Sequence, residues 1–309
     1  MRYRLLLFAP LILLAACSKE NGGPRLDLVG SARYTSTNRT LTRAGDTVTF
    51  KLFSDVRDAE KLLKHIRIFV TYSPVKNPLS YPASGYDPTT AKSDTVFTYL
   101  DSTVSAKEFV LQTTLNARTT SGREQWAFEA EDVDGNKVSR GFRLQYRNPD
   151  SLRSYHSYTA QLQAPGGSTA RRSFLALLPG LTLPRYTITT NAEAKRLVDV
   201  VYVVRNSSIF LAAPNDPFVN HIGRWSTRPT EFRDPNLNKA SFDNAITGDA
   251  LTTLFNGAAA LLPTTRTPAL AKEQVYAFRT ANQKSGLIYV QDIIATPVPT
   301  LILLVKVTK

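Results

Sequence analysis

The sequence contains one short run of oxygen-bearing side chains at the spacing that calcium-binding loops use. Asp132, Asp134 and Asn136 stand at alternate positions, and carboxylate and amide oxygens are ligands that Ca²⁺ prefers. An EF-hand loop also needs a bidentate glutamate at its twelfth position, where this chain has Arg143. The same residues suit a tight turn, because Asp-Gly between two strands favours the positive φ of a hairpin. We therefore expect a hairpin turn here, with calcium binding as the alternative.

A second candidate site lies between Pro214 and Pro235, where an imidazole, a guanidinium and an indole are close in sequence. His221 and Arg224 can donate hydrogen bonds, and Trp225 can stack on the face of a sugar. Long connections between regular elements are often functional. The competing interpretation places the indole in the core as an anchor for the loop. The sequence leaves ligand binding and core packing open at this place.

The usual motifs of catalysis and metal binding are missing from the sequence. The three histidines form no closely spaced pair and there is one cysteine, so we expect neither a metal centre nor a cofactor. No nucleophile elbow, phosphate-binding loop or dinucleotide-binding turn occurs. Asp199 lies inside the apolar run Val198–Val204, and a buried carboxylate needs partners. We expect an arginine or a backbone donor to pair with it.

The N-terminus has the parts of an export signal. Arg2 and Arg4 precede the apolar run Leu5–Ala16, which is shorter than the roughly 20 residues that span a bilayer. The sequence Leu14-Ala15-Ala16-Cys17 resembles the lipobox of bacterial lipoproteins. This resemblance implies cleavage before Cys17 and attachment of lipid to its sulfur. The alternative is an ordinary secretory signal with an incidental cysteine.

Cleavage at this place would leave a short tether, residues 17–25, before the folded part. Lys19-Glu20 resembles the pattern that follows the lipid site in surface-exported lipoproteins of the Bacteroidota. The resemblance implies a protein anchored by lipid in the outer membrane, on its periplasmic side or at the cell surface.

Length and charge limit the class of protein further. The 309 residues, of which 42% are hydrophobic, suffice for two domains with their own cores, and the formal net charge is +13. Most of the excess lies in residues 151–309, with 17 basic and 9 acidic side chains. A basic surface suits an anionic partner, although scattered cations can equally be a solvated surface. Nucleic acid is not expected as the partner of an exported lipoprotein.

Residues 26–148 are predicted to form an immunoglobulin-like β-sandwich. Short runs with alternating apolar residues recur through this part, and Asp55–Lys64 is predicted to form one or two helical turns between two of them. The clearest hairpin joins Gln125–Glu131 to Val138–Tyr146. This aromatic-rich hairpin resembles the last two strands of bacterial immunoglobulin-like domains, without their disulfide. The fold class that we expect is mainly β.

Residues 152–309 are predicted to form a second, β-rich α+β domain, with the boundary at Asn148–Ser151. Asn191 is a candidate N-cap of a short helix, and three strands are expected at the C-terminal end. The runs Val198–Tyr202, Tyr276–Arg279 and Leu303–Val307 resemble a domain of Bacteroidota lipoproteins of unassigned function. The resemblance implies no catalytic residue.

These observations predict a membrane-anchored envelope lipoprotein that acts as a non-catalytic binding or assembly module, with a glycan or another envelope protein as its partner. A hydrolase acting on polysaccharide or peptide, with its site in the second domain, is the alternative. A purely structural role in the envelope is a third possibility.

Overall fold

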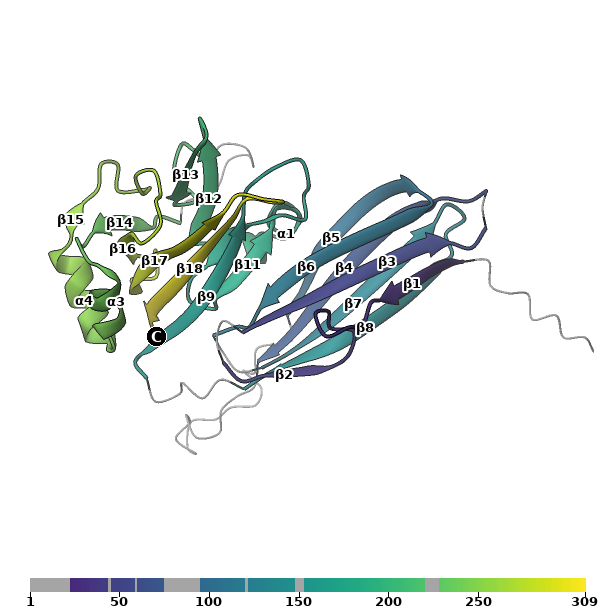
Figure 1. Cartoon of the computed structure of the whole chain (residues 1–309), viewed down its shortest axis with the longest axis horizontal. Helices are drawn as coiled ribbons and strands as arrows, with labels where there is room; N and C mark the ends of the chain where they lie inside the picture. The colour runs from purple at the N-terminus through teal and green to yellow at the C-terminus, as the bar shows by residue number, and fades with distance from the viewer. Residues whose placement is uncertain are drawn as a thin grey trace, which may run out of the picture.

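The computed structural model describes residues 23–43, 46–58, 60–74, 95–119, 122–147, 153–219 and 228–309. The chain is mainly β, as predicted, with four sheets and four short helices in these residues. Figure 1 shows two β-rich halves along the long axis, the N-terminal half elongated and the C-terminal half rounder. The export signal with Cys17, and the predicted boundary at Asn148–Ser151, lie outside the described residues.

Two sheets make up the N-terminal half. The smaller sheet has the order β1-β3-β6 and the larger has the order β2-β8-β7-β4-β5. All neighbours are antiparallel except β2 and β8, which run parallel. The strands are β1 (Pro24–Leu28), β2 (Arg39–Leu41), β3 (Thr47–Val56), β4 (Leu63–Pro74), β5 (Thr95–Ala106), β6 (Glu108–Asn116), β7 (Gly122–Asp132) and β8 (Lys137–Tyr146).

The core of this half lies between the two sheets and is rich in aromatic rings. Trp126, Phe128 and Ala130 of β7 are buried, as the predicted alternation requires. From the opposite sheet, Phe50 packs edge-on against Phe128, with 4.9 Å between ring centroids. Both sheets contribute to this one hydrophobic cluster.

The predicted hairpin between β7 and β8 is confirmed, and so is its turn. Gly135 has a φ of 83°, the left-handed conformation that glycine adopts without strain. The expected helical turns at Asp55–Lys64 are wrong: β3 continues to Val56, β4 begins at Leu63, and the described residues between them form no helix. The strand pairing therefore overrides the local helical pattern.

The C-terminal half also has two sheets, with the orders β11-β10-β12-β13 and β15-β14-β16-β17-β18-β9. The last strand, β18, pairs along its length with β9, the first strand of this half. The three predicted C-terminal strands are confirmed as β16 to β18. The strands are β9 (Tyr155–Gln163), β10 (Arg172–Ala176), β11 (Leu181–Pro184), β12 (Val200–Arg205), β13 (Ser208–Ala212), β14 (Glu231–Asp234), β15 (Ala259–Ala260), β16 (Val275–Arg279), β17 (Ser285–Ile294) and β18 (Thr300–Thr308).

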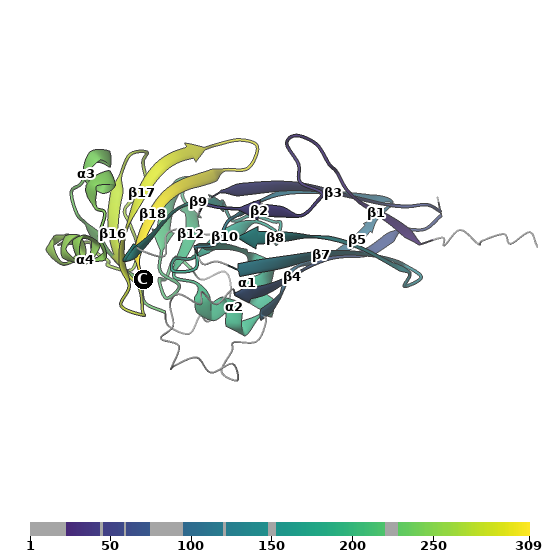
Figure 2. The ribbon, with the colours of Figure 1, turned by 90° about the horizontal axis from the view of Figure 1, so that it is seen from below.

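Side chains from both of these sheets form one buried cluster, and a pair of helices packs on the outer face of each sheet (Figure 2). The four-stranded sheet is covered by α1 (Arg185–Thr190) and α2 (Ala192–Leu197). The six-stranded sheet is covered by α3 (Lys239–Asn244) and α4 (Gly248–Gly257). The side chain of Asn191 accepts a hydrogen bond from the backbone of Ala194 and so caps α2, as predicted.

The two halves pack against each other through apolar and polar contacts. Phe97 of β5 is buried in a hydrophobic cluster whose other members belong to the C-terminal half, among them Leu183 and Ile188. The hydroxyl of Thr187 in α1 donates to the carbonyl of Thr98 at 3.0 Å. The backbone N–H of Thr119 donates to the carbonyl of Pro179 at 3.2 Å. The halves thus share a buried interface.

Candidate functional site

An open groove of about 410 Å³ lies on the C-terminal half, and its volume falls within the usual range for small-molecule sites. It lies between the loop after β9, the start of α1 and the end of β12. We call it the arginine groove. Its lining consists of Pro165, Gly166, Arg185, Val203, Val204, Arg205 and Phe218.

A tight hairpin turn places Arg205 at this groove. Asn206 and Ser207 both have positive φ, 48° and 62°, which is the requirement of a two-residue type I′ turn between antiparallel strands. Arg205 and Ser208 are therefore paired across the end of β12 and β13. The guanidinium of Arg205 is exposed and lies 4.5 Å from the centroid of the Phe218 ring.

Phe218 is held by a buried carboxylate. One oxygen of Asp216 accepts the backbone N–H of Phe218 at 2.8 Å, and the other accepts the hydroxyl of Thr265. Arg266 pairs with the same carboxylate at 3.2 Å and lies 3.9 Å from the Phe218 ring centroid. The ring therefore contacts two guanidinium groups, which is a cation–π arrangement.

On the opposite side of the groove, the loop that contains Pro165 and Gly166 is fixed at several points. The backbone N–H of Ala164 donates to the carbonyl of Pro299 at 2.8 Å, and the backbone N–H of Arg185 donates to the carbonyl of Arg171 at 3.3 Å. A Cβ on Gly166 would lie 2.2 Å from Nη1 of Arg171, so the arginine side chain packs directly over this glycine. The described lining has two arginines and no acidic residue, which makes the groove suited to an anion.

The predicted ligand-binding residues His221, Arg224 and Trp225 lie outside the described residues, so that prediction stays a prediction. Phe218 comes shortly before them in sequence. The sequence did not single out Arg185 and Arg205, because they are far apart in the chain. The only local signal for Arg205 is its position at the end of an apolar strand. Basic residues at such positions are common on solvated surfaces, so this position alone does not indicate a binding site.

The expectation for Asp199 is confirmed. One carboxylate oxygen accepts a hydrogen bond from the backbone N–H of Leu177 at 2.9 Å, and the other accepts one from Nη2 of Arg228 at 3.0 Å. Burial raises the pKa of this carboxyl above its usual value, while the two donors oppose the rise. Asp199 thus links the chain after β10 to Arg228 within the Pro214–Pro235 region and has a structural role.

The residues considered for calcium have protein partners in the turn. Asp132 accepts the N–H groups of Asp134 and Asn136 at 3.0 and 2.9 Å, and its other oxygen accepts the side-chain amide of Asn136 at 2.8 Å. The carboxylate of Asp134 pairs with Lys61 at 2.7 Å. Hydrogen bonding in the turn therefore accounts for their position, and calcium binding stays a prediction.

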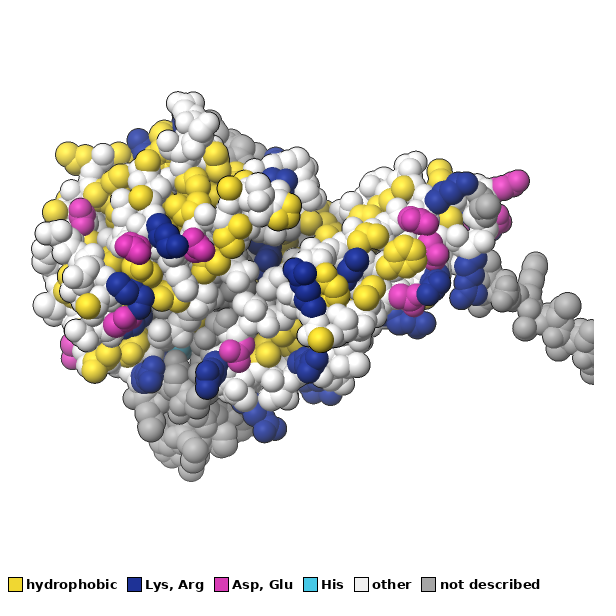
Figure 3. All heavy atoms as spheres, in the orientation of Figure 1, with side chains coloured by type: hydrophobic (Ala, Val, Ile, Leu, Met, Phe, Trp, Pro, Cys, Tyr) yellow, Lys and Arg dark blue, Asp and Glu magenta, His cyan; other side chains and the backbone are white. Residues whose placement is uncertain are grey.

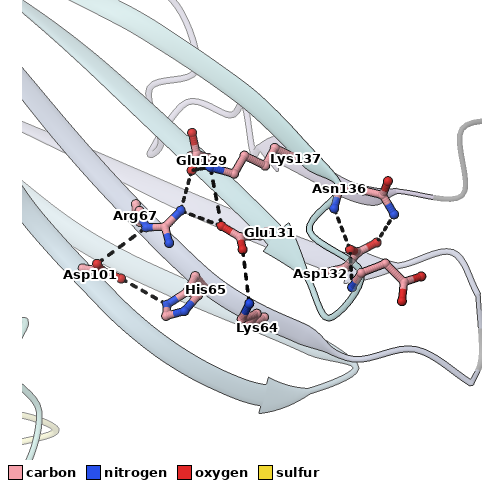
Figure 4. Close-up of polar contacts among 10 residues, drawn as sticks. Lys64, His65, Arg67, Asp101, Glu129, Glu131, Asp132, Asn136 and Lys137 are labelled. Carbon is pink, nitrogen blue, oxygen red and sulfur yellow. Dashed lines mark hydrogen bonds and ion pairs between the residues drawn. The ribbon is translucent and has the colours of Figure 1, made fainter.

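A network of charges covers the outer face of the larger N-terminal sheet (Figure 4). Arg67 of β4 donates to Glu129 and Glu131 of β7, each at 2.7 Å, and lies 3.5 Å from Asp101 of β5. His65 reaches the same aspartate at 3.3 Å. The hydrogen bond from Arg67 lowers the pKa of Glu131. These contacts join three neighbouring strands and leave the central guanidinium paired.

Within the described ranges no three histidine, cysteine, aspartate or glutamate side chains form a group that could hold a metal ion. In the same part of the chain, no helix is long and apolar enough to cross a membrane. Figure 3 shows Lys and Arg side chains scattered over both halves of the visible face. The positive groups of the arginine groove are therefore a local feature within a generally basic surface.

No protein-family model matches the chain, and the comparison with curated proteins found no relative. Among solved structures, a DUF4466 family protein from Parabacteroides merdae matches at 14% identity with a TM-score of 0.39, over 93% of this chain and 99% of that chain. The PmoD soluble domain from Methylocystis matches at 12% identity with a TM-score of 0.19, over 40% of this chain and 90% of that chain. Spo0M, a sporulation control protein from Bacillus subtilis, matches at 10% identity with a TM-score of 0.23, over 63% of this chain and 80% of that chain. These TM-scores are too low to transfer a function.

Proposed function

We propose that this chain is a lipid-anchored, non-catalytic binding protein of the outer membrane, and that an acidic glycan binds in the arginine groove. The observation that carries the binding role is the groove itself. Arg185 and Arg205 line it and can donate charge-assisted hydrogen bonds to a carboxylate, and Pro165 and Val204 add apolar contacts for a sugar ring. A carboxylated sugar would satisfy both properties. An acidic segment of another envelope protein is the competing ligand.

The position of the first strand supports the anchoring role. Cys17 precedes Pro24, the start of β1, by seven residues, and a chain of that length spans at most about 25 Å. β1 begins at the end of the N-terminal half that is remote from the C-terminal half (Figures 1 and 2). A lipid on Cys17 would therefore hold that end at the membrane and present the arginine groove away from it.

The N-terminal half then acts as a spacer with an immunoglobulin-like fold. Its order β1-β3-β6 corresponds to strands A, B and E, and β8-β7-β4-β5 corresponds to G, F, C and C′ of an immunoglobulin-like sandwich. The parallel strand β2 extends the second sheet beside β8. This correspondence in strand order supports the immunoglobulin-like proposal.

A glycosidase would need two carboxyl groups about 5–10 Å apart at a cleft, and a hydrolase acting on peptides would need a nucleophile with a base beside it. The described lining of the arginine groove offers arginine, valine and phenylalanine side chains instead. We therefore propose binding without turnover.

Titration calorimetry with oligogalacturonate, and with a neutral maltooligosaccharide of the same length, tests the binding role. We expect binding of the acidic oligosaccharide only, weakened by salt. Arg205→Met should weaken it roughly 10- to 150-fold, because a charge-assisted hydrogen bond contributes about 1.5–3 kcal/mol. Arg140→Met, on exposed β8, is the control with the same change of charge.

Equal affinity for both oligosaccharides, or an unchanged affinity in Arg205→Met, would contradict the proposed ligand. Binding of a polyglutamate peptide but not of the oligosaccharide would favour the envelope-protein ligand instead.

A further inference from the structure

A fully buried arginine lies at the interface of the two halves with unused hydrogen-bond donors. Arg172 is 2% exposed, and within the described residues its Nε and Nη1 atoms have no hydrogen-bond partner. An arginine side chain stays protonated in proteins, so its charge persists in this environment. Burial lowers its pKa but leaves the group a cation. A buried, unpaired charge is costly unless an opposite charge or several hydrogen bonds compensate it.

A β-bulge sets the position of this side chain. Arg172 begins β10, and the pairing of β10 with β11 shifts register between Arg172 and Phe174. Ser173 is the extra residue, and its hydroxyl donates to the carbonyl of Gln163 at 2.8 Å. Bulges of this kind redirect side chains and occur often beside binding sites.

The guanidinium lines a cavity of about 40 Å³ between the two halves. The N-terminal half contributes Phe97, Tyr99 and Trp126, and the C-terminal half contributes Leu181 and Leu183. The hydroxyl of Tyr99 is also buried without a hydrogen-bond partner in the described residues. In the described residues, three polar atoms of two side chains therefore lack hydrogen-bond partners in one cavity with largely apolar walls.

The acidic residue that lines this cavity is engaged elsewhere. Glu124 accepts Nε of Arg118 on one oxygen. Its other oxygen accepts the indole N–H of Trp126 at 2.8 Å and the hydroxyl of Tyr146 at 2.6 Å. Arg118 thus already balances the charge of Glu124, and in the described part of the chain Arg172 has no carboxylate of its own.

The size of the cavity limits what can compensate the charge. A buried water needs about 10–15 Å³ on this measure, so the space suits about three or four waters or one small anion. Waters would satisfy the donors but leave the charge unpaired. We propose that this cavity is a binding site for a small monovalent anion, chloride or a carboxylate the size of acetate, which joins the two halves through Arg172 and Tyr99.

Anion-dependent melting of the whole protein tests the site. The buffer holds sodium gluconate, whose anion is too large for the cavity, and chloride or acetate replaces it at constant ionic strength. The melting temperature should rise by about 2–4 °C for each tenfold increase in either small anion above its Kd. Arg172→Met should abolish this rise, and the exposed Arg140→Met should retain it.

A wild-type melting temperature that is the same in gluconate, chloride and acetate would overturn the proposal, as would a rise that persists in Arg172→Met. If Arg172→Met does not fold, bromide-soaked crystals of the wild-type protein decide the matter. An anomalous peak within hydrogen-bond distance of the Arg172 guanidinium supports the site, and water alone in the cavity overturns it.

Discussion

At the scale of single residues, the ion pairs on the outer face of the larger N-terminal sheet link stability to pH. Arg67 lowers the pKa of Glu131 in the folded state. A carboxyl whose pKa is lowered by folding stabilises the fold above its unfolded pKa, near 4.3, and this contribution disappears as pH falls through the folded pKa. Protonation of Glu131 therefore contributes to the loss of stability at acid pH.

We predict that Glu131→Gln lowers the urea midpoint at pH 7 and that the difference from wild type shrinks at pH 3. Urea denaturation at both pH values measures it. Glu193→Gln is the matched control, because Glu193 belongs to an exposed pair with Arg196, and exposed pairs contribute little. A Glu131→Gln deficit that is as large at pH 3 as at pH 7 would refute the linkage.

At the scale of elements, a buried lysine closes the end of α3. Nζ of Lys306 in β18 donates to the carbonyls of Phe242, Asp243 and Ala245 at 2.7, 2.9 and 2.9 Å. The last carbonyls of a helix lack partners within the helix, and cations complement that end. This contact fixes α3 on the six-stranded sheet.

Lys306→Met should destabilise the protein by about 2–4 kcal/mol, since the substitution leaves buried carbonyls without a donor. Chemical denaturation followed by circular dichroism measures the loss. Lys239→Met on α3 removes an exposed i,i+4 pair with Asp243 and should cost well under 1 kcal/mol. Similar losses of unfolding free energy in the two variants would show that the buried contacts of Lys306 stabilise the protein no more than an exposed ion pair does.

Elements with a strong local signal could be predicted from the sequence. The Asp134-Gly135 turn, the alternating strand before it and the Asn191 cap each depend on neighbouring residues, and the structure contains them. The helical turns predicted at Asp55–Lys64 failed because pairing of β3 and β4 with their neighbours decides that segment. Intrinsic propensity is weak beside such tertiary contacts.

The arginine groove could not be predicted, because it depends on tertiary packing. Arg185 follows β11, Arg205 ends β12, and Phe218 depends on Asp216 and Arg266. No short sequence pattern joins these positions. The signal that the sequence did contain was coarser: the excess of positive charge in residues 151–309 and the aromatic content near Phe218.

At the scale of the whole molecule, the shared interface couples the stability of the two halves. Phe97 from the N-terminal half is 5% exposed and packs in a cluster of the C-terminal half. Truncation of a buried phenylalanine to alanine costs about 3–5 kcal/mol. Here most of that cost falls on the contact between halves.

Calorimetry of the wild-type protein should show one cooperative transition, and Phe97→Ala should separate it into two. The exposed Val110→Ala, with a 54% exposed side chain, should leave a single transition. Two resolved transitions in the wild-type protein would mean that the halves unfold independently despite the interface.

The lipid anchor is the premise on which the envelope function depends, and the mass of the mature N-terminus tests it most directly. Mass spectrometry of protein purified from membranes should show loss of residues 1–16 and an acyl-glyceryl modification on Cys17. Cys17→Ala should lack the modification and appear in the soluble fraction. A wild-type protein that is soluble and begins with an unmodified Cys17, or retains Met1, would contradict the account.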